Sequence, residues 1–152
     1  MPEKWDLPSE FGPCSCSQLR RTARKVSSLY DAALAACGLS VTQHAVLVSV
    51  ARAAKISRTE LAARLGMERT TLTRNLKPLE EAGLILPAKS QDRRERLLCV
   101  STAGKRRLRQ SYSLWEKAQA AFNAELSPAD LERLASALQK AEATAEKMLK
   151  VR

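Results

Sequence analysis

The sequence predicts a mainly α-helical protein with one small β-hairpin. Only five Gly and six Pro occur among 152 residues, and Ala, Leu, Arg, Lys and Glu are abundant, a composition typical of helical proteins. Three Ser-x-x-Gln or Ser-x-x-Glu patterns each precede apolar residues at helical spacing, which indicates three helix starts. The length fits one domain, or one compact module with helical extensions.

The N-terminal third predicts a loose arm followed by two helices. Residues 1–14 contain three prolines and no periodic pattern, so they are expected to form the arm. Ser15 with Gln18 predicts the start of a first helix that runs to about Ala36 and ends at Cys37-Gly38. Its expected apolar face is formed by Leu19, Ala23, Val26, Tyr30 and Leu34. The Ser40 and Gln43 pair predicts a second helix that carries Val46, Leu47 and Val50.

The middle of the chain predicts a helix-turn-helix. Ser57 and Glu60 precede a short helix, and Gly66 is suited to the positive φ of the turn that follows it. The apolar residues of the first helix are Leu61, Ala62 and Leu65, and the expected buried stripe of the second is Met67, Leu72, Leu76 and Leu79. The opposite face of the second helix carries Thr70, Thr73, Arg74 and Lys77, as expected of a helix that reads DNA. Pro78 should bend its C-terminal half.

The remaining elements are a hairpin and two long helices. Leu84 to Lys89 and Glu95 to Val100 are the expected strands, with a basic tip at Ser90 to Arg94. Ser101 or Thr102 should cap a long helix whose apolar side carries Leu108, Tyr112, Trp115, Phe122 and Leu126. Ser127-Pro128 begins the last helix. Its apolar positions alternate by three and four, which predicts packing against a partner: Leu131, Leu134, Leu138, Ala141, Ala145 and Met148.

Nearly all of the net charge of +10 lies on the helix-turn-helix and hairpin. Residues 52–109 contain 15 basic and 6 acidic side chains, whereas the rest of the chain contains 11 basic and 10 acidic ones. A basic surface of this kind favours a polyanionic partner, because neutralising phosphates releases condensed counterions. The alternative is a merely solvated cationic surface. Because the basic charge is concentrated on a DNA-reading motif, the sequence favours double-stranded DNA as the partner.

With the hairpin in place, the chain resembles the multiple-antibiotic-resistance regulator (MarR) family of bacterial transcription factors over about residues 15–150. The resemblance rests on Leu61-Ala62-x-x-Leu65-Gly66, Thr70 to Arg74, Leu79-Glu80-x-x-Gly83-Leu84-Ile85, and Asp92-x-Arg94-x-x-x-Leu98-x-Val100-Ser101. It implies a winged helix-turn-helix at 41–101, flanked by dimerisation helices at 15–40 and 102–152. It also implies a homodimeric repressor on a palindromic operator, released by a small aromatic or phenolic ligand or by thiol oxidation.

The predicted DNA contacts lie on the second helix of the motif and on the hairpin. They are Arg69, Thr70, Thr73, Arg74, Lys77, Arg93, Arg94 and Arg96. Arg74 is suited to guanine, because its planar fork can bond O6 and N7 together, and Arg94 at the tip is suited to a narrow minor groove. Asp92 is predicted to stabilise the wing through an arginine, with a simple turn residue as the alternative.

The sensor is less sharply specified. Tyr30, His44, Tyr112 and Trp115 form a candidate ligand pocket, although aromatic side chains also serve as plain core and a single histidine as a hydrogen-bonded polar residue. Cys14 and Cys16 form a candidate redox pair, because a helix N-terminus and the nearby Arg20 and Arg21 favour thiolates. Incidental thiols are the alternative. No cofactor or metal site is predicted, since two close cysteines and one distant histidine do not make a tetrahedral set.

Two other function classes fit the sequence less well. An architectural DNA-binding protein without an effector would show weak sequence preference and strongly salt-dependent affinity. A thiol enzyme is disfavoured because no base accompanies the cysteines. No apolar run approaches the roughly 20 residues of a membrane span, and the N-terminus does not read as a signal peptide. We therefore expect a cytoplasmic, nucleoid-associated protein that binds no membrane.

Overall fold

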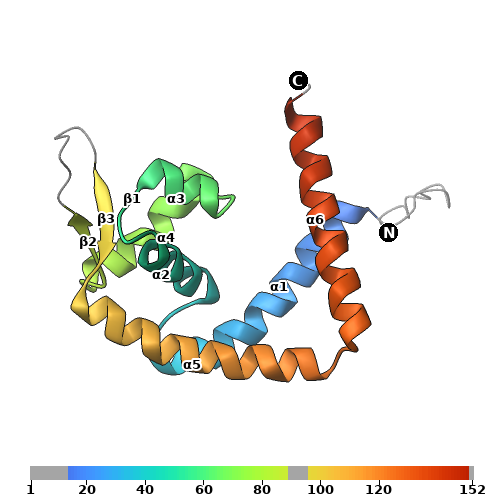
Figure 1. The fold of residues 1–152 in the computed structure, drawn as a ribbon, viewed down its shortest axis with the longest axis horizontal. Coiled ribbons are helices and arrows are strands. Elements are labelled where there is room, and N and C mark those ends of the chain that lie inside the picture. Colours follow the sequence, from blue (N-terminus) through green and yellow to red (C-terminus); the bar gives the residue numbers. More distant parts are fainter. Residues whose placement is uncertain (1–13, 89–95, 151–152) are drawn as a thin grey trace, which may run out of the picture. The chain divides into compact units, whose positions relative to one another are not determined.

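A computed structural model describes residues 14–88 and 96–150, and within them it is mainly helical, as predicted (Figure 1). Contacts group the chain into two compact units, Met1–Leu114 and Trp115–Arg152. The elements in order are α1 (Ser15–Leu34), η1 (Ala35–Cys37), α2 (Val41–Ala53), β1 (Ile56–Ser57), α3 (Arg58–Arg64), α4 (Arg69–Glu81), β2 (Ile85–Ala88), β3 (Leu97–Val100), α5 (Thr102–Ala124) and α6 (Pro128–Lys150).

Two of the three predicted capping boxes form. In α2, the Ser40 hydroxyl accepts from the Gln43 N–H at 3.2 Å, and the Gln43 side chain accepts from the Ser40 N–H at 3.0 Å. In α3, the Ser57 hydroxyl accepts from the Glu60 N–H at 3.2 Å, and Glu60 accepts from the Ser57 N–H at 3.1 Å. Each box satisfies two backbone donors that the first helical turn leaves open.

The third predicted capping box, at the start of α1, does not form, because the helix begins one residue earlier than predicted. Ser15 already has helical geometry, so the N-cap position belongs to Cys14, whose side chain makes no cap hydrogen bond. The predicted apolar face of α1 is buried only toward its C-terminal end, at Tyr30 and Leu34. Leu19 at the other end is 45% exposed.

The core of the first unit is built around α2, which packs against α1, α3, α4 and β3. Its Val46, Leu47 and Val50 are fully buried. The α4 stripe is confirmed for its three leucines, Leu72, Leu76 and Leu79, which are at most 2% exposed. Met67, however, lies before α4 and is half-buried, because the chain is still turning there after Gly66, whose φ is +60°.

The hairpin belongs to a three-stranded antiparallel sheet in the order β1-β3-β2. Ile85 pairs with Val100 and Ala88 with Leu97, so the two predicted strands align in the expected hairpin register. The additional strand β1, which the sequence did not indicate, pairs with the other edge of β3. The predicted basic tip lies outside the described residues.

The base of the hairpin is joined tightly to the start of α5. The Ser101 N–H donates to the carbonyl of Leu84 at 3.0 Å, and the Ser101 hydroxyl donates to the carbonyl of Gly83 at 2.6 Å. The same hydroxyl accepts from the Gly104 N–H at 2.9 Å, so Ser101 caps the helix. A Cβ on Gly104 would lie 2.1 Å from the Leu84 oxygen, so only glycine permits this close approach.

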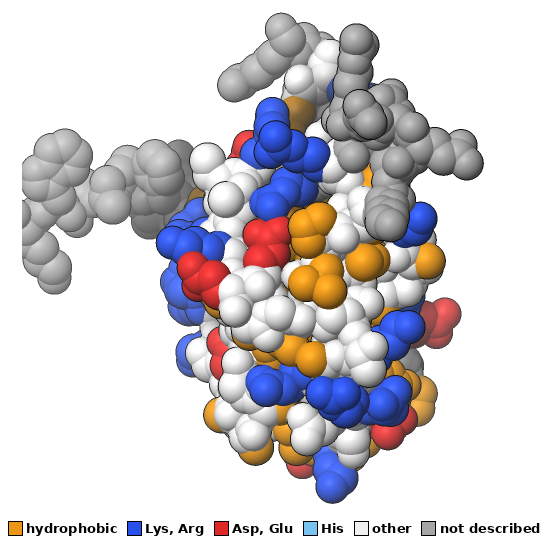
Figure 2. Space-filling model, turned by 90° about the vertical axis from the view of Figure 1, so that its left-hand side faces the viewer, with side chains coloured by type: hydrophobic (Ala, Val, Ile, Leu, Met, Phe, Trp, Pro, Cys, Tyr) orange, Lys and Arg blue, Asp and Glu red, His pale blue; other side chains and the backbone are white. Residues whose placement is uncertain are grey.

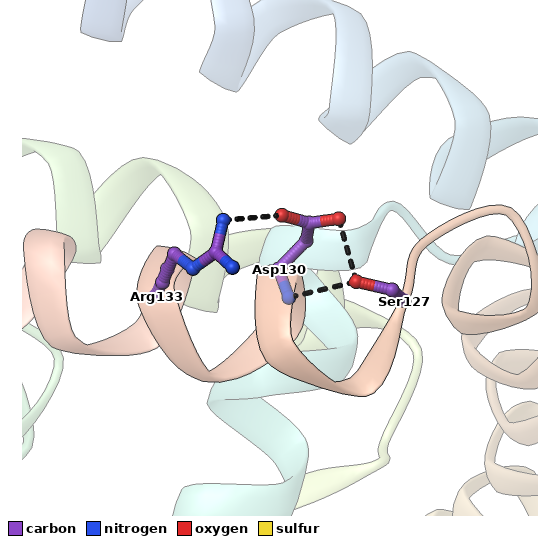
Figure 3. A network of polar contacts seen from close by, with 3 residues as sticks. All are labelled: Ser127, Asp130 and Arg133. Atoms are coloured by element: carbon purple, nitrogen blue, oxygen red, sulfur yellow. Dashed lines mark hydrogen bonds and ion pairs between the residues drawn. The ribbon is translucent and has the colours of Figure 1, made fainter.

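In the second unit, α6 begins as predicted and carries its apolar residues in the open. The Ser127 hydroxyl accepts from the Asp130 N–H at 3.1 Å and donates to the Asp130 carboxylate at 2.6 Å, while Arg133 lies 3.2 Å from the other oxygen (Figure 3). No described residue of α6 is buried. Four large apolar side chains are at least 41% exposed: Leu134, Leu138, Met148 and Leu149.

Candidate nucleic-acid interface

Helix α4 presents opposite faces to the core and to solvent. The leucines of its inner face are buried, whereas Arg69, Thr70, Thr73, Arg74 and Lys77 are all exposed. The Thr73 hydroxyl donates to the carbonyl of Arg69 at 2.8 Å, which leaves its oxygen as an acceptor. Lys77 lies 3.8 Å from Glu81, and both side chains are more than 60% exposed. An ion pair so exposed contributes little stability, so Lys77 can leave Glu81 and bind a phosphate instead.

A groove runs between α4 and the base of the hairpin, and we call it the helix–wing groove. It has a volume of about 610 Å³ and is lined by Arg58, Arg69, Glu80, Pro87, Ala88, Arg96, Leu97 and Leu98. Arg58 Nη2 lies 2.6 Å from Glu80 Oε1 within it. Sequence reasoning missed both residues of this ion pair, because they are 22 positions apart and only folding brings them together.

The wing contributes one described cation, Arg96, which is exposed just before β3. Asp92, Arg93 and Arg94 lie outside the described residues, so their predicted roles stay predictions. Figure 2 shows groups of Lys and Arg side chains across the side of the molecule that carries the hairpin. Such a surface attracts the phosphate backbone of a nucleic acid.

His44 and Tyr30, two of the candidate sensor residues, are buried. His44 is 5% exposed, and its Nδ1 lies 2.9 Å from the Ser111 hydroxyl. Burial lowers the pKa of His44 and raises the pKa of Tyr30. Tyr112 is half exposed, and Trp115 belongs to the second unit.

A pocket of about 490 Å³ lies between α2 and α5, and we call it the α2–α5 pocket. It is lined by Val48, Ala51, Arg52, Lys105, Leu108, Arg109 and Tyr112. Tyr112 is the member of the predicted sensor set that lines it. Three cationic and four uncharged side chains surround the space, an arrangement suited to an apolar molecule with a negative group.

Cys14 and Cys16 are both exposed, while Cys37 is buried and donates from its thiol to the carbonyl of Leu34. Hydrogen bonding from the backbone and then the hydroxyl of Ser17, with a smaller contribution from the backbone of Cys16, lowers the pKa of Cys14. The pKa of Cys14 therefore moves in the predicted direction, and these hydrogen bonds rather than Arg20 and Arg21 are its cause.

Residues 14–88 and 96–150 contain no candidate site for a metal ion. No group of three His, Cys, Asp or Glu side chains in these ranges could hold a metal ion. No single described helix is long and apolar enough to cross a membrane, although the bent pair Ser15–Cys37 and Val41–Ala53 passes by length and composition.

Residues 38–95 match the sequence profile of the MarR family. The M. tuberculosis transcriptional regulator MosR, solved in complex with DNA, is 35% identical to this chain with a TM-score of 0.73. That match covers 87% of this chain and 98% of MosR. The chain belongs to the MarR family. Membership makes it a DNA-binding transcription regulator and not an enzyme.

More distant members of the MarR family share the fold. A variant of E. coli MarR with operator DNA is 23% identical, with a TM-score of 0.75, and the match covers 83% of this chain and 91% of that one. CouR from Rhodococcus jostii RHA1, bound to p-coumaroyl-CoA, is also 23% identical, with a TM-score of 0.71 and coverages of 82% and 88%. No curated protein matches the sequence.

Proposed function

We propose that this MarR-family protein is a repressor that binds a palindromic operator as a homodimer. The observation that carries this proposal is the exposed polar and basic face of α4, which lies opposite three buried leucines. This face offers side chains suited to base edges and phosphates, and we expect the wing arginines to reach the adjacent minor groove. Exposed leucines on α6 support a partner chain.

The DNA half of the proposal is tested by selecting operators from genomic fragments and measuring affinity for palindromic and random duplexes. We expect Arg74→Ala and Arg94→Ala each to weaken operator binding by about fivefold or more, since one lost base contact costs about 1–3 kcal/mol. Arg133→Ala, which removes an exposed cation of α6, is the control and should leave affinity unchanged. Equal affinity for palindromic and random DNA would instead support an effector-independent architectural protein.

We propose the α2–α5 pocket as the site of a small aromatic acid. The uncharged residues suit an aromatic ring, and Arg52, Lys105 and Arg109 suit its carboxylate. A panel of benzoate-type and cinnamate-type acids should contain a compound that releases the operator. Arg109→Ala should raise the concentration needed by about tenfold, the effect of about 1.4 kcal/mol, whereas Arg106→Ala, on the same helix outside the pocket, should not. No release by any compound would refute this site.

We propose thiol oxidation as a second route of release, through Cys14 and Cys16. The Cys14 thiolate attacks a peroxide, which is reduced to water or an alcohol as the sulfur becomes a sulfenic acid. Cys16 then displaces water from that sulfur and closes a disulfide. Cys14→Ser with Cys16→Ser should abolish release by peroxide and leave release by an aromatic acid intact, with Cys99→Ser as the control. Peroxide sensitivity that survives in the double variant would contradict this route.

A further inference from the structure

The helix–wing groove has an unequal balance of charge. Its lining contains three arginines, Arg58, Arg69 and Arg96, and one carboxylate, that of Glu80. Arg58 is held by Glu80 through a single guanidinium nitrogen, and the two side chains are 42% and 29% exposed. A guanidinium has five N–H donors, so this contact leaves Arg58 able to bind a second oxygen acceptor from solvent.

The position of the groove identifies what would occupy it. One wall carries α4 residues and the other carries residues of β2 and β3 at the base of the hairpin. In the proposed complex, α4 lies in the major groove and the hairpin in the neighbouring minor groove. The sugar–phosphate backbone separates those two grooves of the duplex, so it must cross the protein between helix and hairpin.

We propose that Arg58 binds a DNA backbone phosphate in the helix–wing groove and that Glu80 is the positioning residue that restrains it. This inference rests on the proposed function, since it requires α4 and the hairpin to occupy adjacent grooves. Glu80 orients the guanidinium before DNA arrives and lowers the positive charge of the groove. Because phosphate contacts carry no sequence information, this restraint weakens attraction to all DNA equally.

The competing interpretation is that the ion pair only braces the fold, since Arg58 begins α3 and Glu80 lies near the end of α4. The double variant Arg58→Gln/Glu80→Gln separates the two interpretations. It keeps the net charge of the groove but removes the cation that would bind phosphate. Loss of a brace would lower the melting temperature, whereas loss of a phosphate contact would lower the salt dependence of DNA binding.

The experiment is a salt titration of operator binding between 50 and 200 mM for the wild type and the double variant. Each lost phosphate contact reduces the slope of log affinity against log salt by about 0.9, so a dimer should lose about 1.8. The ratio of wild-type affinity to double-variant affinity should therefore fall about twelvefold between 50 and 200 mM salt. Glu80→Gln alone should tighten binding to operator and random duplexes by the same factor.

A matched control is provided by Asp130→Asn/Arg133→Gln, which neutralises another exposed arginine–carboxylate pair, on α6. It should leave the salt slope unchanged. If the Arg58→Gln/Glu80→Gln protein keeps the wild-type slope, the phosphate contact is refuted, and a lowered melting temperature would then identify the pair as a brace. If the wild type itself shows no preference for any palindrome, the proposed function is refuted. That result is distinguishable from an unchanged salt slope in the double variant, which refutes only the phosphate contact.

Discussion

At the scale of single residues, the His44 side chain shows how a polar group is accommodated between α2 and α5. The Ser111 hydroxyl has one hydrogen, which it donates to the carbonyl of Leu108 at 3.1 Å. Nδ1 of His44 lies 2.9 Å from the same oxygen, which accepts from Nδ1 in the tautomer that carries hydrogen there. Burial opposes a charge on the ring, and the pKa of His44 falls below its ordinary value of 6.5.

This depressed pKa predicts a loss of stability in mild acid. As the pH drops below 6.5, the unfolded chain takes up a proton on His44 while the folded chain does not. The free energy of unfolding therefore decreases as the pH is lowered, until the pH reaches the pKa of His44 in the folded chain. Because the chain has one histidine, His44→Gln should flatten the dependence between pH 7 and pH 5.5 in urea denaturation. Parallel curves for wild type and variant would contradict this assignment.

Residue roles were predictable where a single element defines them. Spacings of three and four place Thr73 and Arg74 opposite Leu72 and Leu76, and the structure confirms the division. The partnership of His44 with Ser111 was not predictable, because 67 positions separate these two residues and only the packing of two helices joins them. Apart from Tyr112, the residues that line the α2–α5 pocket escaped prediction for the same reason.

At the scale of elements, the hairpin and α5 approach each other closely at Gly104. Gly104→Ala would place a methyl carbon 2.1 Å from the Leu84 oxygen and 2.7 Å from a Val100 methyl group. Neither neighbour is a flexible chain end, so we expect unfolding to become easier by about 3 kcal/mol, toward the upper end for overpacking. Chemical denaturation measures this change.

The comparison for that variant is Gly66→Ala. Its Cβ would meet nothing within 4 Å, so it incurs only the strain of a φ of +60°, about 1–2 kcal/mol. Gly104→Ala should therefore be the more destabilising of the two. The opposite order would show that the junction yields easily and that hairpin and α5 are not rigidly joined.

A helix or strand could be predicted where residues close together in the sequence define it. Ser40 and Ser57 mark helix starts because a side chain and a backbone three residues apart satisfy each other. Strand β1 could not be predicted, since two residues have no period and exist as a strand only through pairing with β3. Met67 was placed on the buried stripe of α4, yet it lies five positions before Leu72, and the helix begins only at Arg69, after the turn at Gly66.

At the scale of the whole molecule, the exposed apolar side of α6 predicts association. Leu134 and Leu138 are 41% and 47% exposed and lie four residues apart on one face. Large contiguous apolar surfaces rarely remain in water, and a heptad-like repeat suits a second helix of the same kind. We expect a mass of twice 16.8 kDa by light scattering at micromolar concentration.

Leu138→Arg should convert this dimer to monomers and weaken operator binding, because one half-site contact then replaces two. Since Leu138 contributes no buried contact within one chain, the helical content of the first unit should not change. Ser136→Arg adds the same charge on the opposite face of α6 and should remain dimeric. A mass near 16.8 kDa for the wild type would refute the interface directly.

The exposure of α6 also bears on how the amount of this protein would be controlled. A helix that buries none of its described residues gains little stability from packing, which supplies most of the stability of helices in proteins. In the proposed dimer, α6 would become ordered as two chains meet, and a solitary chain would present a frayed segment to proteases. Degradation would then remove unpaired chains first, and the lifetime of each molecule would depend on finding its partner.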